Sequence, residues 1–243
     1  MQARYWQCAA LRQTPRQAWD HSHGLTDLQV CTDYRIATQQ LNLHHAGRPA
    51  NNECRKRPGC RGNVETPAHL FWKCLYAEVL LDKLVGHWTG KRPFRQRTQQ
   101  FFNACASRRV YYAPLYRTSI FRGQEDRGVA EQLWKRIWHI LATMCHTKLW
   151  TDRKDSVYKA AVLDLAGTTQ SFWTSCVCQL RAIATREHQK EACAMMGAVL
   201  FACIELLEYG PEGSPGMSGP SPIQRPDQPG LNSWLRIYQR YCT

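Results

Sequence analysis

The sequence predicts a mainly α-helical protein, in which a small helical region built around a polar, cysteine-containing turn is followed by a helical bundle. Two observations predict this fold class. Apolar residues recur at three- and four-residue steps over long stretches, and the alternation typical of β-strands is nearly absent. With 243 residues, 44% of them hydrophobic, the chain is long enough to bury one large core or two small ones.

The first helix is predicted within residues 26–43, where apolar residues recur without proline or glycine. Polar, turn-rich sequence follows from 49 to 67. A second helix is predicted from 68 to 88, because its apolar residues follow one helical face. These residues are Leu70, Phe71, Cys74, Leu75, Val79, Leu80, Leu84, Val85 and Trp88.

The second half of the chain predicts a bundle. A strong helix is expected at 129–150, where two adjacent apolar stripes make a face too wide for a single neighbour. The stripes are Val129, Leu133, Ile137, Leu141 and Met144, and Trp134, Trp138, Cys145 and Leu149. Further helices are predicted at about 155–165, 171–188 and 191–209.

The predicted domain organisation follows from these elements. Residues 1–110 form a basic region with a core at about 18–88, and residues 111–209 form the bundle. Residues 210–230 are rich in glycine and proline, which predicts a flexible linker. Residues 231–243 carry aromatic and aliphatic side chains at helical spacing, which predicts a short C-terminal helix.

Charge is distributed unevenly along the chain. Residues 1–124 carry 19 Lys and Arg against 7 Asp and Glu, a net charge of +12, whereas residues 125–243 carry 13 against 12, a net of +1. Positive charge held near phosphates displaces condensed counterions, so the first half is suited to binding nucleic acid. Charge alone leaves two alternatives open, which are binding of RNA or single-stranded DNA and a basic surface that serves solubility.

Two groups of basic residues are the candidate contacts with nucleic acid. One group lies between and just after the first cysteines of the polar turn, and the other lies in 91–109, where arginines alternate with aromatic residues. Arginine can hold phosphates while bases stack on rings. The alternative is a solvated face whose aromatics enter the core. The candidates are Arg55, Lys56, Arg57, Arg61, Lys91, Arg92, Arg95, Arg97, Arg108 and Arg109.

No apolar leader with a small-residue cleavage site follows Met1, so we expect the twelve cysteines to remain reduced in an intracellular protein, nuclear or cytoplasmic. The most apolar stretch, 192–204, has thirteen residues without a charge. A membrane span needs roughly 18 or more, so this stretch predicts a buried helix and no membrane partner.

Four potential metal ligands fall within 21 residues: Cys54, Cys60, His69 and Cys74. Cysteines grouped with a histidine in a reduced protein suggest zinc, and four protein donors close its tetrahedral shell, which predicts a structural site. The fold class can then be stated as a small zinc-knuckle-containing helical region followed by a helical bundle. In a regular α-helix His69 and Cys74 would lie about 140° apart, unless the first turn after Pro67 is irregular.

Other cysteines and histidines are weaker candidates. His21 and His23 are spaced by one residue but fit a solvated loop, and His44 or His45 could replace one of the four ligands. Cys176 and Cys178 point to different faces of a helix. Cys145, Cys193 and Cys203 sit among apolar residues and are expected in the core.

The string CRKRPGCRGNVETPAHLFWKC resembles the zinc-binding domain that follows the polymerase in non-LTR retrotransposon reverse transcriptases. That family shows a cysteine pair, Glu-Thr, His-Leu-Phe and a final cysteine. The matching residues here are Cys54, Cys60, Glu65, Thr66, His69, Leu70, Phe71 and Cys74. The resemblance covers roughly residues 18–88 and implies zinc at the Cys/His set and binding of template RNA or DNA. Five residues separate Cys54 from Cys60, where the family usually has two.

A second segment, 149–158, is similar to the Trp-x-x-Arg-Asn-like segment found after the zinc region in many such polyproteins. Its matching residues are Trp150 and Arg153, and Lys154 stands in place of the asparagine. No Tyr-x-Asp-Asp motif of a polymerase is present, and no endonuclease or ribonuclease H residues can be assigned. By resemblance the chain is a tail of a longer element.

Two functional hypotheses follow. The first is a non-catalytic, zinc-stabilised module that binds nucleic acid, with no enzymatic activity of its own. The alternative is a helical protein-interaction or relic domain without metal, in which the cysteines are core residues. An enzyme is the least favoured reading, because no set of nucleophile, base and orienting group can be identified.

Overall fold

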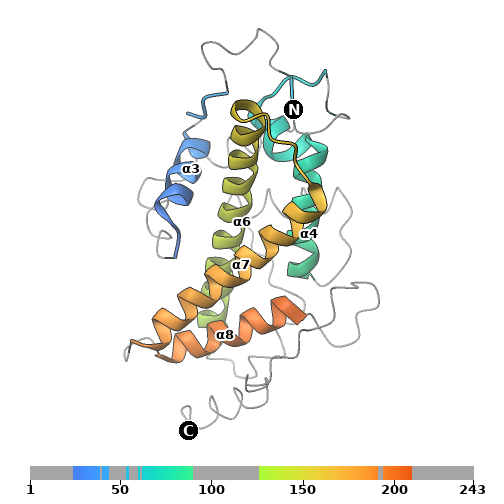
Figure 1. The fold of residues 1–243 in the computed structure, drawn as a ribbon. Helices are drawn as coiled ribbons and strands as arrows, with labels where there is room; N and C mark the ends of the chain where they lie inside the picture. The colour runs from blue at the N-terminus through green and yellow to red at the C-terminus, as the bar shows by residue number, and fades with distance from the viewer. Residues whose placement is uncertain are drawn as a thin grey trace.

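The computed structural model describes residues 24–38, 40–43, 53–54, 60, 62–89, 126–190 and 194–209. Within these ranges the chain is mainly helical, which confirms the predicted fold class (Figure 1). The helices are α3 (Asp27–Ala37), the π-helical turn η2 (His69–Lys73), α4 (Leu75–Thr89), α6 (Asp126–Tyr158), α7 (Leu165–His188) and α8 (Ala194–Tyr209). An isolated antiparallel bridge joins Glu53 and Val64.

Helix α6 runs through the middle of the molecule, with α3 on one side, α4 on the other, and α7 crossing it (Figure 1). Its 33 residues span about 50 Å. The two predicted apolar stripes from Leu133 to Leu149 are buried, as expected for a helix with several neighbours. Trp88 of α4 packs against Trp134 and Trp138, with ring centroids 5.6 Å and 4.9 Å apart.

Helices α7 and α8 form a hairpin, in which α8 packs along α7 (Figure 1). The approach is close at Gly197, where an added Cβ would lie 2.4 Å from the backbone nitrogen of His188. A glycine is needed there because any side chain would collide with main-chain atoms, which cannot move aside. The remaining face of the hairpin meets α4, so segments from both halves of the sequence share one core.

Side-chain hydrogen bonds to the backbone explain why α3 and α7 begin where they do. Thr26 and Gln29 form a reciprocal capping box at α3, with the two hydrogen bonds at 3.4 Å and 2.9 Å. Asp164 accepts hydrogen bonds from the backbone N–H groups of Ala166 and Gly167 at α7. Helix α3 lies within the predicted 26–43 range but ends at Ala37.

Two predicted helices differ from the structure. The continuous helix expected at 68–88 is interrupted at Cys74, whose ψ of 129° is extended and separates η2 from α4. The helix expected at 155–165 is wrong. Residues up to Tyr158 belong to the end of α6, and Ala160 has a left-handed φ of 50° that a helix cannot accommodate.

Several predictions fall on residues outside the described ranges. They are the contents of 91–125, the linker at 210–230, the C-terminal helix at 231–243 and the domain boundary near 110. Helices α7 and α8 are found where the 171–188 and 191–209 predictions placed them, although α7 begins earlier, at Leu165. None of the described helices is both long and apolar enough to cross a membrane.

Candidate metal centre

A tight turn and a single bridge bring the first two cysteines together. The backbone N–H of Cys54 donates to Asn63 O at 2.9 Å, beside the Glu53–Val64 bridge. The N–H of Asn63 in turn donates to Cys60 O at 3.1 Å, which closes a four-residue turn. Gly62 has a φ of +84° in this turn, a conformation that favours glycine. The result is a knuckle in which both thiols are buried.

The π-helical turn brings the other two candidates together. Thr66 starts the turn, because its side-chain oxygen accepts from His69 N at 3.1 Å and Pro67 follows it as the first helical residue. The N–H of Cys74 then donates to His69 O at 2.8 Å, an i+5 to i bond. Residues five apart lie one turn apart in this geometry. The irregular first turn anticipated from the sequence is therefore present, and it brings His69 and Cys74 closer to one side of the helix than a regular α-helix would.

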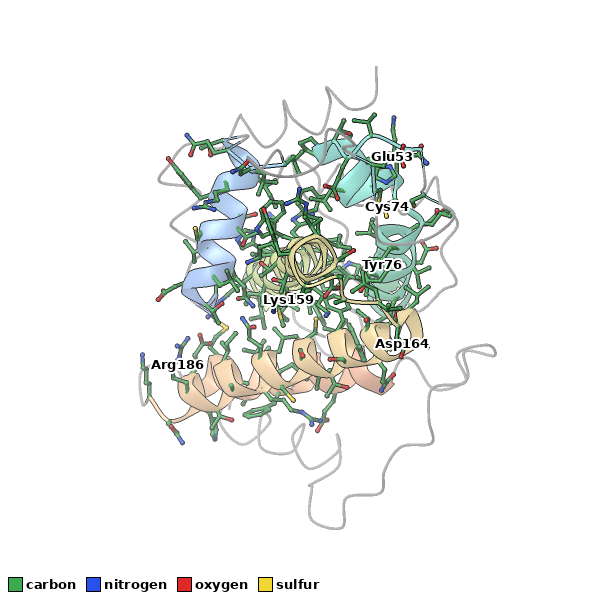
Figure 2. All side chains as sticks on the ribbon, turned by 45° about the horizontal axis from the view of Figure 1, so that its top comes forward. Glu53, Cys74, Tyr76, Lys159, Asp164 and Arg186 are labelled. Carbon is green, nitrogen blue, oxygen red and sulfur yellow. The ribbon has the colours of Figure 1, made fainter. Side chains whose placement is uncertain are left out.

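All four candidate ligands are buried, and their ligand atoms lie within 4.8 Å of one another. The Sγ atom of Cys74 is 3.8 Å from Sγ of Cys54 and 3.7 Å from Sγ of Cys60. A disulfide requires about 2.05 Å, so the three cysteines are reduced thiols and none of them forms a disulfide. Figure 2 shows Cys74 beside Glu53, at the corner of the molecule where η2 meets α4.

These separations suit a tetrahedral metal ion. With metal–sulfur bonds of about 2.3 Å, the edges of a tetrahedron between two sulfurs measure about 3.8 Å. Both sulfur pairs at Cys74 already have this spacing. The cluster can therefore hold a metal ion with small side-chain adjustments, and four protein donors leave no position for a substrate.

Burial affects both the pKa of the Cys60 thiol in the cluster and the hydrogen bonding of the imidazole. Burial raises the pKa of the Cys60 thiol, although a hydrogen bond from the backbone N–H of Leu75 partly opposes the effect. Atom Nε2 of His69 is buried and has no hydrogen-bond partner among the described residues. A buried nitrogen without a partner is costly unless it binds something, and a metal ion satisfies it.

A buried ion pair connects this cluster to α6. The Arg153 side chain donates from Nε to Oε2 of Glu65 at 2.9 Å, and both side chains are 1% exposed. The same guanidinium donates to the backbone carbonyls of Leu43 and Asn42, at 2.8 Å and 3.4 Å. Glu65 and Arg153 belong to separate sequence motifs, and no local pattern pairs them, because 88 positions separate them.

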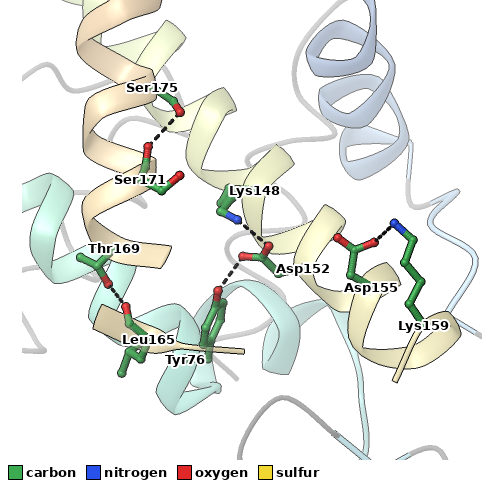
Figure 3. Close-up of polar contacts among 9 residues, drawn as sticks. All are labelled: Tyr76, Lys148, Asp152, Asp155, Lys159, Leu165, Thr169, Ser171 and Ser175. Atoms are coloured by element: carbon green, nitrogen blue, oxygen red, sulfur yellow. Dashed lines mark hydrogen bonds and ion pairs between the residues drawn. The ribbon is translucent and has the colours of Figure 1, made fainter. Parts of the chain in front are cut away.

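A second polar network lies next to the ion pair. The hydroxyl of Tyr76 donates to Asp152 Oδ2 at 2.6 Å, and Lys148 donates to Oδ1 at 2.6 Å (Figure 3). Burial raises the pKa of Tyr76 well above its usual range, and the bond to Asp152 adds to this effect. The tyrosine therefore remains a neutral donor that fixes the first turn of α4 to α6.

The structure brings together the whole predicted ligand set and separates it from the weaker candidates. Cys145, Cys176 and Cys203 are buried among apolar side chains, and Cys178 is exposed. His21, His23, His44, His45 and Cys193 lie outside the described ranges, as do all ten candidate nucleic-acid contacts. These contacts are Arg55, Lys56, Arg57, Arg61, Lys91, Arg92, Arg95, Arg97, Arg108 and Arg109.

Comparison of the chain with protein-family models, with curated proteins and with solved structures finds no match.

Proposed function

We propose that the chain is a non-catalytic, zinc-stabilised module that binds single-stranded nucleic acid, similar to the tail of a non-LTR retrotransposon reverse transcriptase. The observation that carries the proposal is the buried cluster of three thiols and one imidazole, with its tetrahedral sulfur spacing. Three thiolates with one imidazole are a donor set that zinc favours in closed, structural sites.

The contacts around the cluster also support the resemblance. The Glu-Thr and His-Leu-Phe motif residues have distinct structural tasks, since Glu65 pairs with Arg153, Thr66 caps η2, and Phe71 packs edge-on against His146. Arg153 belongs to the second segment similar to the family, the one that begins near Trp150. A common structural purpose for both segments favours one functional unit over chance similarity.

The zinc proposal is tested by metal analysis of the purified protein. We expect about one zinc per chain, lost in Cys74→Ser together with a lower thermal midpoint. The matched control is Cys203→Ser, because Cys203 is equally buried but lies in the apolar core. It should lose stability while keeping its zinc. Wild-type protein that is metal-free would contradict the proposal and favour the relic domain.

The nucleic-acid proposal rests on the net charge of +12 in residues 1–124 and on the resemblance. Binding of a labelled single-stranded RNA should weaken steeply between 50 and 200 mM salt, about 300-fold if six phosphates are contacted. Replacing Arg92, Arg95 and Arg97 by Gln should weaken binding and reduce the salt slope. The control is Arg181→Gln with Arg186→Gln on α7. Binding that is absent or insensitive to salt would reject this part.

A further inference from the structure

Arg153 contacts two of the described segments that lie near the metal cluster. Its Nη2 and Nη1 atoms bind the carbonyls of Leu43 and Asn42, in the segment that precedes Cys54 in the sequence. Its Nε binds Glu65, which lies between Cys60 and His69. The guanidinium also lies over the ring of Trp150, 5.1 Å from its centroid. One side chain of α6 therefore contacts both segment 40–43 and the segment between Cys60 and His69.

Stabilisation of the fold does not by itself account for the buried Arg153–Glu65 ion pair. A buried ion pair costs about as much to desolvate as it returns, and apolar side chains of the same volume are often equally stable. The planar fork of arginine instead fixes direction, because each donor demands an acceptor at one place. Here the acceptors are a carboxylate and two backbone carbonyls, all on segments continuous with the ligands.

Glu65 transmits this constraint over a short distance. It is followed directly by Thr66, the cap that orients His69, and it is preceded by Val64, whose bridge to Glu53 positions Cys54. A shift of Glu65 therefore displaces ligands on both sides of it. Metal sites depend on such supporting groups, which hold the ligands in the geometry that the ion requires.

We propose that Arg153 is a positioning residue for the metal site, which couples occupancy of that site to the docking of the knuckle and of segment 40–43 on α6. The inference rests on the proposed zinc binding. Because coupling between two equilibria is reciprocal, loss of Arg153 weakens metal binding, and loss of metal loosens the contacts of Arg153.

Zinc affinity, measured by competition with a chromophoric chelator, tests the first direction. Arg153→Met keeps the apolar stem and removes the donors, and we expect its affinity to fall about ten- to hundredfold. Arg153→Lys keeps the charge without the fork and should fall between Arg153→Met and wild type. The control is Arg136→Met, which removes an ion pair to Glu187 from the same helix, away from the cluster, and should leave zinc affinity unchanged.

A double variant separates positioning from general destabilisation. Arg153→Met removes the charge partner of buried Glu65, whereas Arg153→Met with Glu65→Met removes both charges. We expect the double variant to regain thermal stability in the metal-free state but not zinc affinity. Recovery of wild-type affinity would show that the pair serves stability alone and would overturn the proposal.

Hydrogen exchange tests the reciprocal direction. In wild-type protein, zinc should slow exchange of the backbone amides at 41–43 and 150–156, and in Arg153→Lys this zinc-dependent protection should be much smaller. Equal protection in both proteins, or wild-type zinc affinity in a folded Arg153→Met protein, would also overturn the inference. Failure of the proposed function appears earlier and separately, as a wild-type protein that binds no zinc.

Discussion

His69 differs from His87, which is half-buried, and from buried His146 in what surrounds its ring. His87 stacks on Trp173 with centroids 3.8 Å apart, and His146 meets Phe71 edge-on, whereas the ring of His69 has a nitrogen within 4.8 Å of three thiols. Burial lowers the pKa of both His87 and His146 to about 4, so these two remain neutral core residues. Among the histidines in the described part of the chain, only His69 is placed to bind a metal ion.

We expect that cysteine can replace His69 as the fourth metal ligand. His69→Cys supplies a fourth thiolate, and zinc accepts four thiolates as readily as three with an imidazole. We expect His69→Cys to retain about one zinc per chain and His69→Ala to lose most of it, as measured by metal analysis after dialysis. Equal zinc content in wild type and His69→Ala would show that this imidazole is not a ligand.

His87 predicts a defined pH dependence. Its pKa is about 4 in the folded protein, chiefly through burial with Lys83 adding to it, and about 6.5 in an unfolded chain. Since the folded state binds the proton less readily, the stability from neutral His87 is present above pH 6.5 and lost as pH falls from 6.5 to 4. Over that window the loss is at most about 3 kcal/mol.

The measurement is urea unfolding of wild type and His87→Phe between pH 7 and pH 4. Phenylalanine keeps the stack on Trp173 but cannot take up a proton, so the variant should lose less stability on acidification. Metal release affects both proteins alike and cancels in the difference. His188→Phe, at an exposed position, is the control and should follow wild type. Identical pH slopes for wild type and His87→Phe would contradict the assignment.

The four ligands could be predicted from the sequence because cysteine and histidine have few other reasons to gather in a reduced protein. The Glu65–Arg153 pair could not, because each residue alone fits an exposed, solvated position equally well. Its existence depends on the fold bringing α6 to the segment after the knuckle. Buried charge is a property of the tertiary structure, and local sequence carries no signal for it.

At the scale of elements, the largest difference from prediction is the length of α6. Apolar periodicity stops at Trp150, yet the helix continues to Tyr158. Its last turns bury Asp152, Arg153 and Ser156, polar residues that a hydrophobicity pattern assigns to solvent. The sequence indicates η2 and the break at Cys74 only as an irregular first turn, since a π-helical turn has no characteristic amino-acid composition.

The end of α6 lacks its usual sequence signal for a physical reason. Lys159 N and Ala161 N both donate to Asp155 O, at 3.0 Å and 3.2 Å, and the residue between them, Ala160, is left-handed. Glycine normally occupies that position because a Cβ there is strained. Because alanine stands there, residues 155–165 contain no glycine or proline to mark a helix end, and their pattern predicts one helix.

Ala160→Gly should therefore stabilise the protein. Relief of the left-handed strain outweighs the extra freedom of glycine in the unfolded chain by about 0.5–1 kcal/mol. A higher urea midpoint with unchanged slope would be the expected result. Ala161→Gly is the matched control, since Ala161 has no left-handed conformation to relieve, and it should not raise the midpoint. A lower midpoint for Ala160→Gly would argue against strain at this helix end.

At the scale of the whole molecule, the metal cluster lies at one edge of the helical core and is continuous with it. The core is formed by α4, α6, α7 and α8, with Trp88 and Trp134 fully buried at its centre. The cluster lies at one end of α4 and is joined to the core through Cys74, Tyr76 and the Arg153 contacts. Most of the apolar burial that drives folding is therefore independent of the ion.

This arrangement predicts how the protein responds to loss of metal. A strong chelator at 25 °C should leave most of the helical far-UV circular dichroism intact, because the core helices keep their packing. Near-UV signals and the thermal midpoint should fall as the knuckle loosens. Trp88→Ala is the contrasting variant, since it opens a cavity between α4 and α6 and costs about 3–5 kcal/mol.

The two perturbations should thus separate cluster from core. Chelation lowers stability locally and reversibly, and restored zinc recovers the midpoint, whereas Trp88→Ala lowers the helical signal or the midpoint whether zinc is present or not. Complete loss of helicity on chelation would mean that the core cannot form without the ion. The chain would then resemble small zinc domains that are unfolded without metal, and the apolar contacts between α4 and α6 would be insufficient to fold it.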